Sequence, residues 1–282
     1  MEIIKNRREL SERIDIFRQG GLTIGFVPTM GALHQGHLSL VEKSKKETNI
    51  TVVSIFVNPT QFNDSKDLEQ YPRTIETDIE KLEASETDIL FLPDEKEMYP
   101  EKDERKFDFG NLDKVMEGKF REGHFNGVAQ IVSKLFECVK PQKAFFGLKD
   151  FQQYVIVKAL VNRYMFKTKI EIVGCPIVRE ANGLAMSSRN ELLKPEERKN
   201  AGIIYSELQK AKQFAKRYSV SELKRKVVEN INQNPFLEVE YFEIVDDVEL
   251  KTIKSWRKKN RKVGCIAVFC GSVRLIDNIY FD

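Results

Sequence analysis

The first half of the chain alternates apolar runs with amphipathic stretches. Leu22–Val27, Ile50–Val57 and Asp88–Leu92 are short runs rich in branched side chains, and a proline follows each of them within two residues. Between these runs, residues 36–46 and 73–85 carry apolar side chains at helical spacing. Short buried strands that alternate with surface helices are typical of a parallel sheet, so this pattern predicts a doubly wound α/β domain.

The same alternation continues after a polar stretch at residues 94–118. Helical spacing is found at about 127–139 and again at about 150–162, and each of these segments precedes an apolar run. The two runs are Lys143–Gly147 and Lys169–Val173. They extend the predicted sheet by two strands.

The pattern changes at Gly174-Cys175-Pro176, which is the best candidate for a domain boundary. Beyond it, helices are predicted near 195–217 and 220–232, and strands near 237–245, 263–270 and 272–280. Gly271-Ser272 joins the last two strands and predicts a hairpin. We therefore expect a Rossmann-like domain over residues 1–175 and a smaller C-terminal α+β domain over 176–282, which carries an antiparallel sheet.

Composition narrows the class of protein. The 282 residues are 41% hydrophobic and 32% charged, and 46 basic against 43 acidic residues leave a net charge of only +3. This balance argues against a nucleic-acid-binding surface. No apolar run is long enough for a membrane span, and the charged N-terminus does not look like a signal peptide, so we expect a cytoplasmic protein. The four cysteines form no C-x-x-C pair and are interpreted as buried free thiols.

The most informative stretch is PTMGALHQGH, which lies between the first predicted strand and the next helix. His34 and His37 are three residues apart, so both side chains would lie on one face at the N-terminus of that helix. A helix N-terminus carries unpaired N–H groups and a partial positive charge, which suits phosphate oxygens. Gly31 and Gly36 allow close approach of the backbone to a ligand. The stretch therefore predicts a site at which two imidazoles donate hydrogen bonds to a reacting phosphate.

Three further stretches carry candidate ligand-binding groups. Ser187, Ser188 and Arg189 follow a glycine-containing loop and could clamp a triphosphate, although serine and asparagine also favour plain turns. Lys149 could neutralise phosphate, whereas Asp150 beside it has the alternative role of a helix cap. In NPTQF, side-chain amides at the end of a strand suit a hydroxy acid, and they also form ordinary turns.

Six motifs in order along residues 26–190 resemble the pantothenate synthetase, or pantoate–β-alanine ligase, family. They are FVPTMGALHQGH, FVNPTQF, YPRT, GHFNGV, FFGLKDFQQ and GLAMSSRN. The family belongs to the nucleotidyltransferase superfamily, whose two signature loops flank ATP. His34-Gln35-Gly36-His37 resembles the first loop, and Met186-Ser187-Ser188-Arg189 resembles the second, with Arg189 in place of a lysine.

The resemblance implies a reaction in two steps. The carboxylate of pantoate attacks the α-phosphorus of ATP, with Mg²⁺ bound, to give pantoyl adenylate and pyrophosphate. The amine of β-alanine then attacks the acyl carbon and releases pantothenate and AMP. The C-terminal domain would be a lid, and a homodimer is expected. A nucleotidyltransferase that acts on a phosphorylated acceptor is the main alternative, since it would share the fold and the first histidine motif.

The resemblance also implies roles for individual residues. His37, His34, Lys149 and Arg189 would be catalytic, with His37 as a hydrogen-bond donor to the transferring phosphoryl group. Gln61 and Gln153 would be the pantoate-binding amides, and Asp78 an outer magnesium ligand, with a solvated helix carboxylate as its alternative. ATP contacts would come from Met30, His34, His37, Gly147, Lys149, Asp150, Val178, Met186, Ser187, Ser188 and Arg189. One departure is Glu122, which stands two residues before His124 where the family usually has proline.

Overall fold

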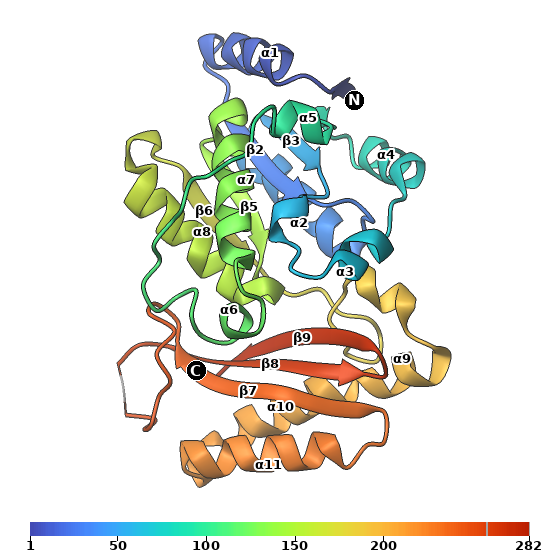
Figure 1. The fold of residues 1–282 in the computed structure, drawn as a ribbon, viewed down its shortest axis with the longest axis vertical. Coiled ribbons are helices and arrows are strands. Elements are labelled where there is room, and N and C mark those ends of the chain that lie inside the picture. The colour runs from blue at the N-terminus through green and yellow to red at the C-terminus, as the bar shows by residue number, and fades with distance from the viewer. Residues whose placement is uncertain (258, 282) are drawn as a thin grey trace. The chain divides into compact units, whose positions relative to one another are not determined.

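The computed structural model describes residues 1–257 and 259–281. Its larger sheet has six strands in the order β1-β4-β3-β2-β5-β6, and all the neighbours pair in parallel (Figure 1). The strands are β1 (Glu2–Ile4), β2 (Ile24–Thr29), β3 (Ile50–Ile55), β4 (Ile89–Phe91), β5 (Lys143–Gly147) and β6 (Glu171–Cys175). The parallel, doubly wound sheet predicted from the alternation of apolar and amphipathic segments is confirmed.

Helices pack on this sheet because their apolar faces would otherwise be exposed to water. The helix α2, for example, buries Leu40 and Val41 in a cluster with Val27 of β2 and Val53 of β3. The helices of this part of the chain are α1 (Arg7–Gln19), α2 (Gln35–Glu47), α3 (Ser65–Gln70), α4 (Ile75–Ala84), α5 (Glu95–Met98), α6 (Glu117–Phe120), α7 (His124–Val139) and α8 (Phe151–Tyr164). No helix in the described part of the chain combines the length and the apolar character needed to cross a membrane.

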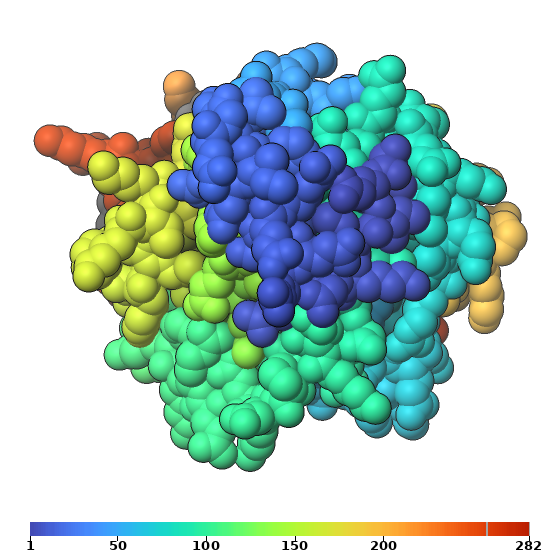
Figure 2. Space-filling view, turned by 90° about the horizontal axis from the view of Figure 1, so that it is seen from above, coloured from blue at the N-terminus to red at the C-terminus, as the bar shows by residue number. Residues whose placement is uncertain are grey.

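The N-terminal segment covers one end of α7. Lys140, just after α7, donates to Asp15 of α1 at 2.8 Å, and its carbonyl accepts from Arg18 at 2.6 Å. When the molecule of Figure 1 is seen from above, the first residues of the chain, in blue, lie at the centre of the visible face (Figure 2). The sequence pattern did not predict β1, a strand of three residues of which the first is charged.

The smaller sheet is antiparallel, as the hairpin at Gly271-Ser272 predicted. It consists of β7 (Leu237–Asp246), β8 (Lys262–Cys270) and β9 (Val273–Tyr280), in that order. The helices beside it are α9 (Pro195–Ala201), α10 (Ile203–Phe214) and α11 (Val220–Asn232). The region expected to be helical near 195–217 is interrupted at Gly202, where a Cβ atom would meet the carbonyl oxygen of Asn182 at 2.4 Å.

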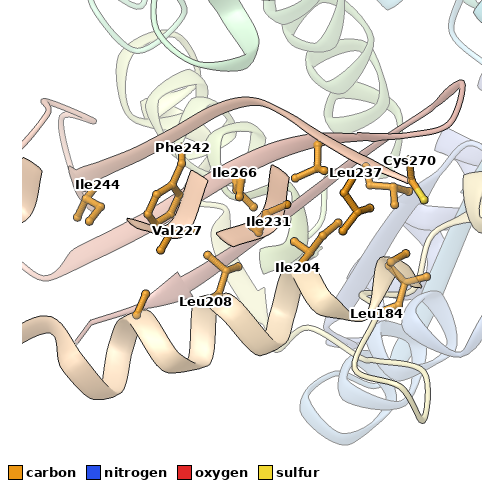
Figure 3. Packing of buried hydrophobic residues seen from close by; sticks show 14 of the residues in the cluster. Leu184, Ile204, Leu208, Val227, Ile231, Leu237, Phe242, Ile244, Ile266 and Cys270 are labelled. Carbon is orange, nitrogen blue, oxygen red and sulfur yellow. The ribbon is translucent and has the colours of Figure 1, made fainter. Parts of the chain in front are cut away.

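One hydrophobic core joins these helices to the antiparallel sheet. Leu208 of α10 and Ile231 of α11 are fully buried, and they belong to one cluster with the sheet residues Ile244, Ile266 and Cys270 (Figure 3). Truncating a buried leucine of this kind typically costs about 2–5 kcal/mol, so the cluster is a main source of stability for this part of the chain.

The chain divides into two compact units that are not continuous in sequence. The first consists of Met1–Phe109, Arg121–Leu148 and Ile156–Pro176, and the second of Gly110–Phe120, Lys149–Val155 and Ile177–Asp282. The amide of Gln152 links two segments of the second unit, since it donates to the carbonyls of Leu112 and Val115 and accepts from the N–H of Glu117. The expected domain ranges 1–175 and 176–282 remain a prediction.

The four cysteines are buried and are not joined in disulfides. Burial raises the pKa of Cys175 to about 11 and that of Cys270 to about 11. Burial also raises the pKa of Cys138 and of Cys265. The prediction of buried free thiols is therefore confirmed.

Candidate active site

The two histidines of the first motif lie where β2 passes into α2. His34 is the N-cap of α2 and has an extended backbone, and its Nδ1 accepts the N–H of Gly36 at 3.1 Å. The Nδ1 atom of His37 accepts the N–H of His34 at 3.3 Å. The two rings lie side by side, with centroids 4.1 Å apart and planes tilted by 33°. The predicted shared face at a helix N-terminus is thus present.

These backbone contacts fix the tautomer of both rings. Because Nδ1 of His34 and Nδ1 of His37 each accept a hydrogen bond, the proton of each neutral imidazole sits on Nε2. Both side chains are partly exposed. The ring N–H groups of both histidines therefore lie at a helix N-terminus, whose backbone dipole favours an anion.

Asp78 of α4 holds the loop that precedes the histidines. Its side chain is completely buried, and its oxygens accept the N–H of Ala32 at 2.8 Å and the N–H of Leu33 at 2.7 Å. The alternative interpretation of Asp78 as a solvated helix carboxylate is wrong, because these two donors replace water. Its role as an outer magnesium ligand stays a prediction.

Gln61 lies in a small network of amides just after β3. Its Oε1 accepts from Nδ2 of Asn58 at 3.2 Å, and its Nε2 donates to Sδ of Met30 at 3.0 Å. Asn58 is fixed in turn, since Nδ2 donates to the carbonyl of Gly127 and Oδ1 accepts from the hydroxyl of Tyr99 at 2.7 Å. A backbone carbonyl can only accept, so the carbonyl of Gly127 identifies the atom of Asn58 that faces it as Nδ2. The same Nδ2 faces Gln61, so the Gln61 atom in that contact is Oε1, and Nε2 is the atom that donates to Met30. Gln61 and Met30, predicted separately for pantoate and ATP, are therefore in contact.

The third histidine, His124, contacts the backbone of Gln61. His124, at the start of α7, is 6% exposed, and its Nδ1 lies 2.8 Å from the carbonyl oxygen of Gln61. The guanidinium of Arg121 lies 3.3 Å from Nε2 of His124. A guanidinium can only donate, so Nε2 is the acceptor and Nδ1 donates to Gln61. The GHF motif thus has a structural contact that the sequence did not reveal.

The second signature loop forms a short hairpin with the residues before it. Met186 donates its N–H to the carbonyl of Val178 at 3.0 Å, and Arg179 pairs with Ala185 as an isolated bridge. Ser187 then caps a 3₁₀ turn (Ser188–Leu192) by accepting the N–H of Arg189. Two predicted ATP-contact residues, Val178 and Met186, are therefore adjacent, and Ser187, Ser188 and Arg189 follow directly.

Neighbouring residues of β9 contact both stretches of the second unit that the sequence predicted to bind phosphate. Asp277 is 6% exposed and forms a bidentate pair with Arg179, at 2.7 and 3.0 Å. Asn278 donates to the carbonyl of Lys149 at 3.0 Å. The Nζ atom of Lys149 lies 3.9 Å from Oδ2 of Asp150. The sequence carried no signal for Asp277 or Asn278, since in a strand they look like any other polar residues.

The candidate residues are divided between the two units. Met30, His34, His37, Gln61, Asp78 and Gly147 belong to the first unit, and Lys149, Asp150, Gln153, Val178, Met186, Ser187, Ser188 and Arg189 to the second. Gln153 is partly exposed, whereas its neighbour Gln152 is buried and fully engaged with backbone. Among the described residues, no cluster of three or more His, Cys, Asp or Glu side chains could hold a metal ion.

Comparison with known proteins gives one consistent result. A family model described as pantoate-beta-alanine ligase matches residues 2–280. Pantothenate synthetase of Bacteroides fragilis (strain YCH46) is 53% identical over 281 residues, which cover 100% of this chain and 99% of that protein. The protein of the same name from Porphyromonas gingivalis (strain W83) is 49% identical over 282 residues and 100% of both chains.

Solved structures are similar over the same length. The crystal structure of pantothenate synthetase from Thermus thermophilus has a TM-score of 0.90 at 39% identity, covering 100% of this chain and 99% of that chain. Pantoate-beta-alanine ligase from Francisella tularensis, complexed with Beta-gamma ATP and β-alanine, has a TM-score of 0.82 at 35% identity, covering 100% and 98%.

Proposed function

The chain belongs to the pantoate–β-alanine ligase family and catalyses the ATP-dependent condensation of pantoate with β-alanine, and from this premise we propose that it proceeds through a pantoyl adenylate. ATP is the co-substrate. The observation that carries the mechanism is the pair of imidazoles at the N-terminus of α2, whose Nδ1 atoms are occupied by backbone N–H groups. This arrangement provides N–H donors for charge that develops on a phosphoryl group.

In the proposed first step, a carboxylate oxygen of pantoate attacks the α-phosphorus of ATP. The new bond is an acyl phosphate bond, and the bond to pyrophosphate breaks. His37 and His34 would donate from Nε2 to the oxygens of the reacting phosphoryl group. Lys149 and Arg189 would offset the charge on the leaving pyrophosphate. A carboxylate needs no general base, so His37 acts here as a hydrogen-bond donor.

In the proposed second step, the neutral amine of β-alanine attacks the acyl carbon. The amide bond forms, AMP leaves, and the amine loses a proton. Gln61 and Gln153 would bind pantoate through their amides. Contacts to ATP would come from Met30, Gly147, Asp150, Val178, Met186, Ser187 and Ser188. Catalysis in this scheme rests on positioning and charge stabilisation, with no covalent intermediate on the enzyme.

Magnesium is proposed to reach the site as the ATP complex. The described residues offer no ready cluster of protein ligands, which fits an ion held mainly by phosphate oxygens and water. When bound, the ion would neutralise phosphate charge.

A homodimer in the cytoplasm is the proposed state of the protein. The dimer follows from the family resemblance, and light scattering after size-exclusion chromatography would test it. The cytoplasm is supported by the four buried cysteines without disulfides, which are typical of a reducing compartment.

The test of the adenylate is the exchange of labelled pyrophosphate into ATP with β-alanine left out. We expect exchange that requires pantoate and falls about 10²–10³-fold in His37→Ala, the range seen when a donor to a developing charge is removed. Addition of β-alanine should then give net release of AMP. A folded preparation that binds ATP but shows no exchange with pantoate would overturn the adenylate route. Phosphorylated acceptors would then be assayed, since the alternative nucleotidyltransferase activity requires them.

A further inference from the structure

We propose that Asp78 is a positioning residue that, together with Lys81, holds the loop of residues 31–34 in its catalytic conformation. This inference rests on the proposed function and deepens it. It also gives the buried carboxylate a role other than metal binding. All the groups involved lie in the first unit.

The loop needs an anchor because its backbone is unfavourable. Gly31 has φ +81° and Ala32 has φ +49°, so two consecutive residues are left-handed. For alanine this conformation costs roughly 1–2 kcal/mol. Consecutive N–H groups in such a turn point to the same side and form a small anion-binding concavity. Here the N–H groups of Ala32 and Leu33 point at one carboxylate.

The anion in this concavity is the carboxylate of Asp78, which uses one oxygen for each donor. Oδ2 accepts from Ala32 at 2.8 Å, and Oδ1 accepts from Leu33 at 2.7 Å. Oδ1 also lies 3.3 Å from the hydroxyl of Thr74. Asp78 is completely buried, and charge-assisted hydrogen bonds of this kind are about twice as strong as neutral ones. A metal ion bound directly would have to displace donors that the loop depends on.

The same helix makes a second contact with the loop. Lys81, one turn further along α4, donates from Nζ to the carbonyl of Leu33 at 2.6 Å. The backbone of Leu33 is therefore held at its N–H by Asp78 and at its carbonyl by Lys81. The side chain of Leu33 is 2% exposed and packs in the core. The next residue is His34. The contacts of Asp78 and Lys81, called the clamp below, therefore fix the backbone directly before the two histidines.

The close fit of Gly31 supports the same role. A Cβ atom on Gly31 would meet Oδ2 of Asp78 at 3.2 Å and Cγ2 of Ile55 at 3.1 Å. The carboxylate and β3 thus hold the loop from two sides. A displacement of about 1 Å at a reacting group can cost about 10²-fold in rate, so this clamp bears directly on catalysis.

The experiment compares Asp78→Asn, Lys81→Met and the matched control Glu76→Gln. Asparagine retains one acceptor oxygen but turns an amide NH₂ toward the second backbone donor, and methionine keeps the aliphatic stem of Lys81. Glu76 is an exposed acid in the same helical turn as Asp78, so its substitution removes a charge without touching the loop. Each variant is assayed for pantoate-dependent pyrophosphate exchange and for the midpoint of its magnesium titration.

We expect Asp78→Asn to lower kcat for exchange at least about tenfold, with the KM for pantoate and the magnesium midpoint within about twofold of the wild-type values. Lys81→Met should lower kcat in the same way, and Glu76→Gln should not change it. Adding Ala32→Gly to Asp78→Asn should recover part of kcat, because glycine adopts a positive φ without strain. Amide hydrogen exchange at Ala32 and Leu33 should be faster in Asp78→Asn, and this measurement does not depend on activity.

Three outcomes would overturn the proposal. They are an unchanged kcat in both Asp78→Asn and Lys81→Met, a loss in Asp78→Asn that higher magnesium restores, and unchanged amide exchange at Ala32 and Leu33. If Asp78→Asn does not fold, Lys81→Met decides alone. Failure of the proposed function is distinct, since wild-type protein would then show no exchange with pantoate at all.

Discussion

At the scale of single residues, the backbone determines which nitrogen carries the proton in each imidazole of the candidate site. His34 and His37 both use Nδ1 to satisfy N–H groups at the start of α2. Helix N-termini leave such groups unpaired, and serine or aspartate usually caps them. A histidine in this position performs the capping with one nitrogen, and in the proposed mechanism the other donates to phosphate. On this proposal, capping and catalysis are separate functions of the same side chain.

The variant His37→Asn tests this separation. The amide oxygen of asparagine can take the place of Nδ1, whereas nothing replaces Nε2. We expect His37→Asn to be more stable than His37→Ala by up to about 1 kcal/mol, the usual contribution of a cap, and to be equally poor in pyrophosphate exchange. Urea unfolding and the exchange assay measure the two properties. Restored exchange in His37→Asn would mean that Nδ1 alone matters.

Local sequence was sufficient to predict some residue contacts and insufficient for others. The three-residue spacing of His34 and His37 fixed their shared face, because helical geometry depends only on spacing. Asp78 looked like any acid on a helix surface, since its burial depends on two N–H groups 45 and 46 positions earlier in the chain. Asp277 and Asn278 were missed for the same reason: their partners, Arg179 and Lys149, are distant in sequence.

At the scale of elements, Gly127 allows α7 to approach the 3₁₀ turn η1 (Pro59–Gln61) closely. A Cβ atom there would meet the carbonyl oxygen of Thr60 at 2.3 Å and the N–H nitrogen of Gln61 at 2.7 Å. Both are backbone atoms and cannot rotate away. The helix and the turn that carries Gln61 are therefore placed by a contact that only glycine permits.

Gly127→Ala should consequently destabilise the protein, although the same change in an exposed helix stabilises by about 0.5–1 kcal/mol. We expect a loss of about 1–3 kcal/mol, typical of overpacking, and a raised KM for pantoate because Gln61, the proposed pantoate-binding amide, moves. Denaturant unfolding and steady-state kinetics measure these effects. Glu137→Ala, on the exposed face of the same helix, is the control and should leave KM unchanged. A stabilised Gly127→Ala variant would contradict this account.

Periodicity predicted the long elements and missed several short ones. The strands β2, β3 and β5 were found because their apolar runs are bounded by proline or glycine. The helices α3, α5 and α6 have six, four and four residues, too few to establish a period. The close approach of Gly202 to the carbonyl of Asn182 is likewise contained in no local pattern.

At the scale of the whole molecule, stability at low pH should depend on Asp103. Its side chain is 4% exposed, is hydrogen-bonded to Arg105 at 2.7–3.2 Å and lies 3.4 Å from Lys134. The hydrogen bond from Arg105 is the main cause that lowers the pKa of Asp103 from 3.8 to about 2. Because the folded state lowers this pKa, the ionised group stabilises the protein above about pH 4, and this contribution is lost as the pH falls toward about 2.

Asp103→Asn should therefore cost up to about 2 kcal/mol at pH 7, and the difference from wild type should shrink as the pH falls from about 4 to about 2. Urea unfolding at about pH 7 and below about pH 3.5 measures this difference. Glu12→Gln, which removes an exposed partner of Arg8, should have little effect at either pH. A difference that stays constant with pH would show that Asp103 acts through packing alone.

The buried cysteines have a practical consequence for spectroscopy. Thiol-reactive dyes attack the thiolate, and burial keeps Cys138, Cys175, Cys265 and Cys270 both protonated and shielded at neutral pH. A fluorophore directed to one cysteine introduced at the exposed Leu192, close to the second signature loop, would then label that position selectively. Because the four native cysteines would stay unlabelled, ligand binding could be followed by fluorescence without first removing any of them.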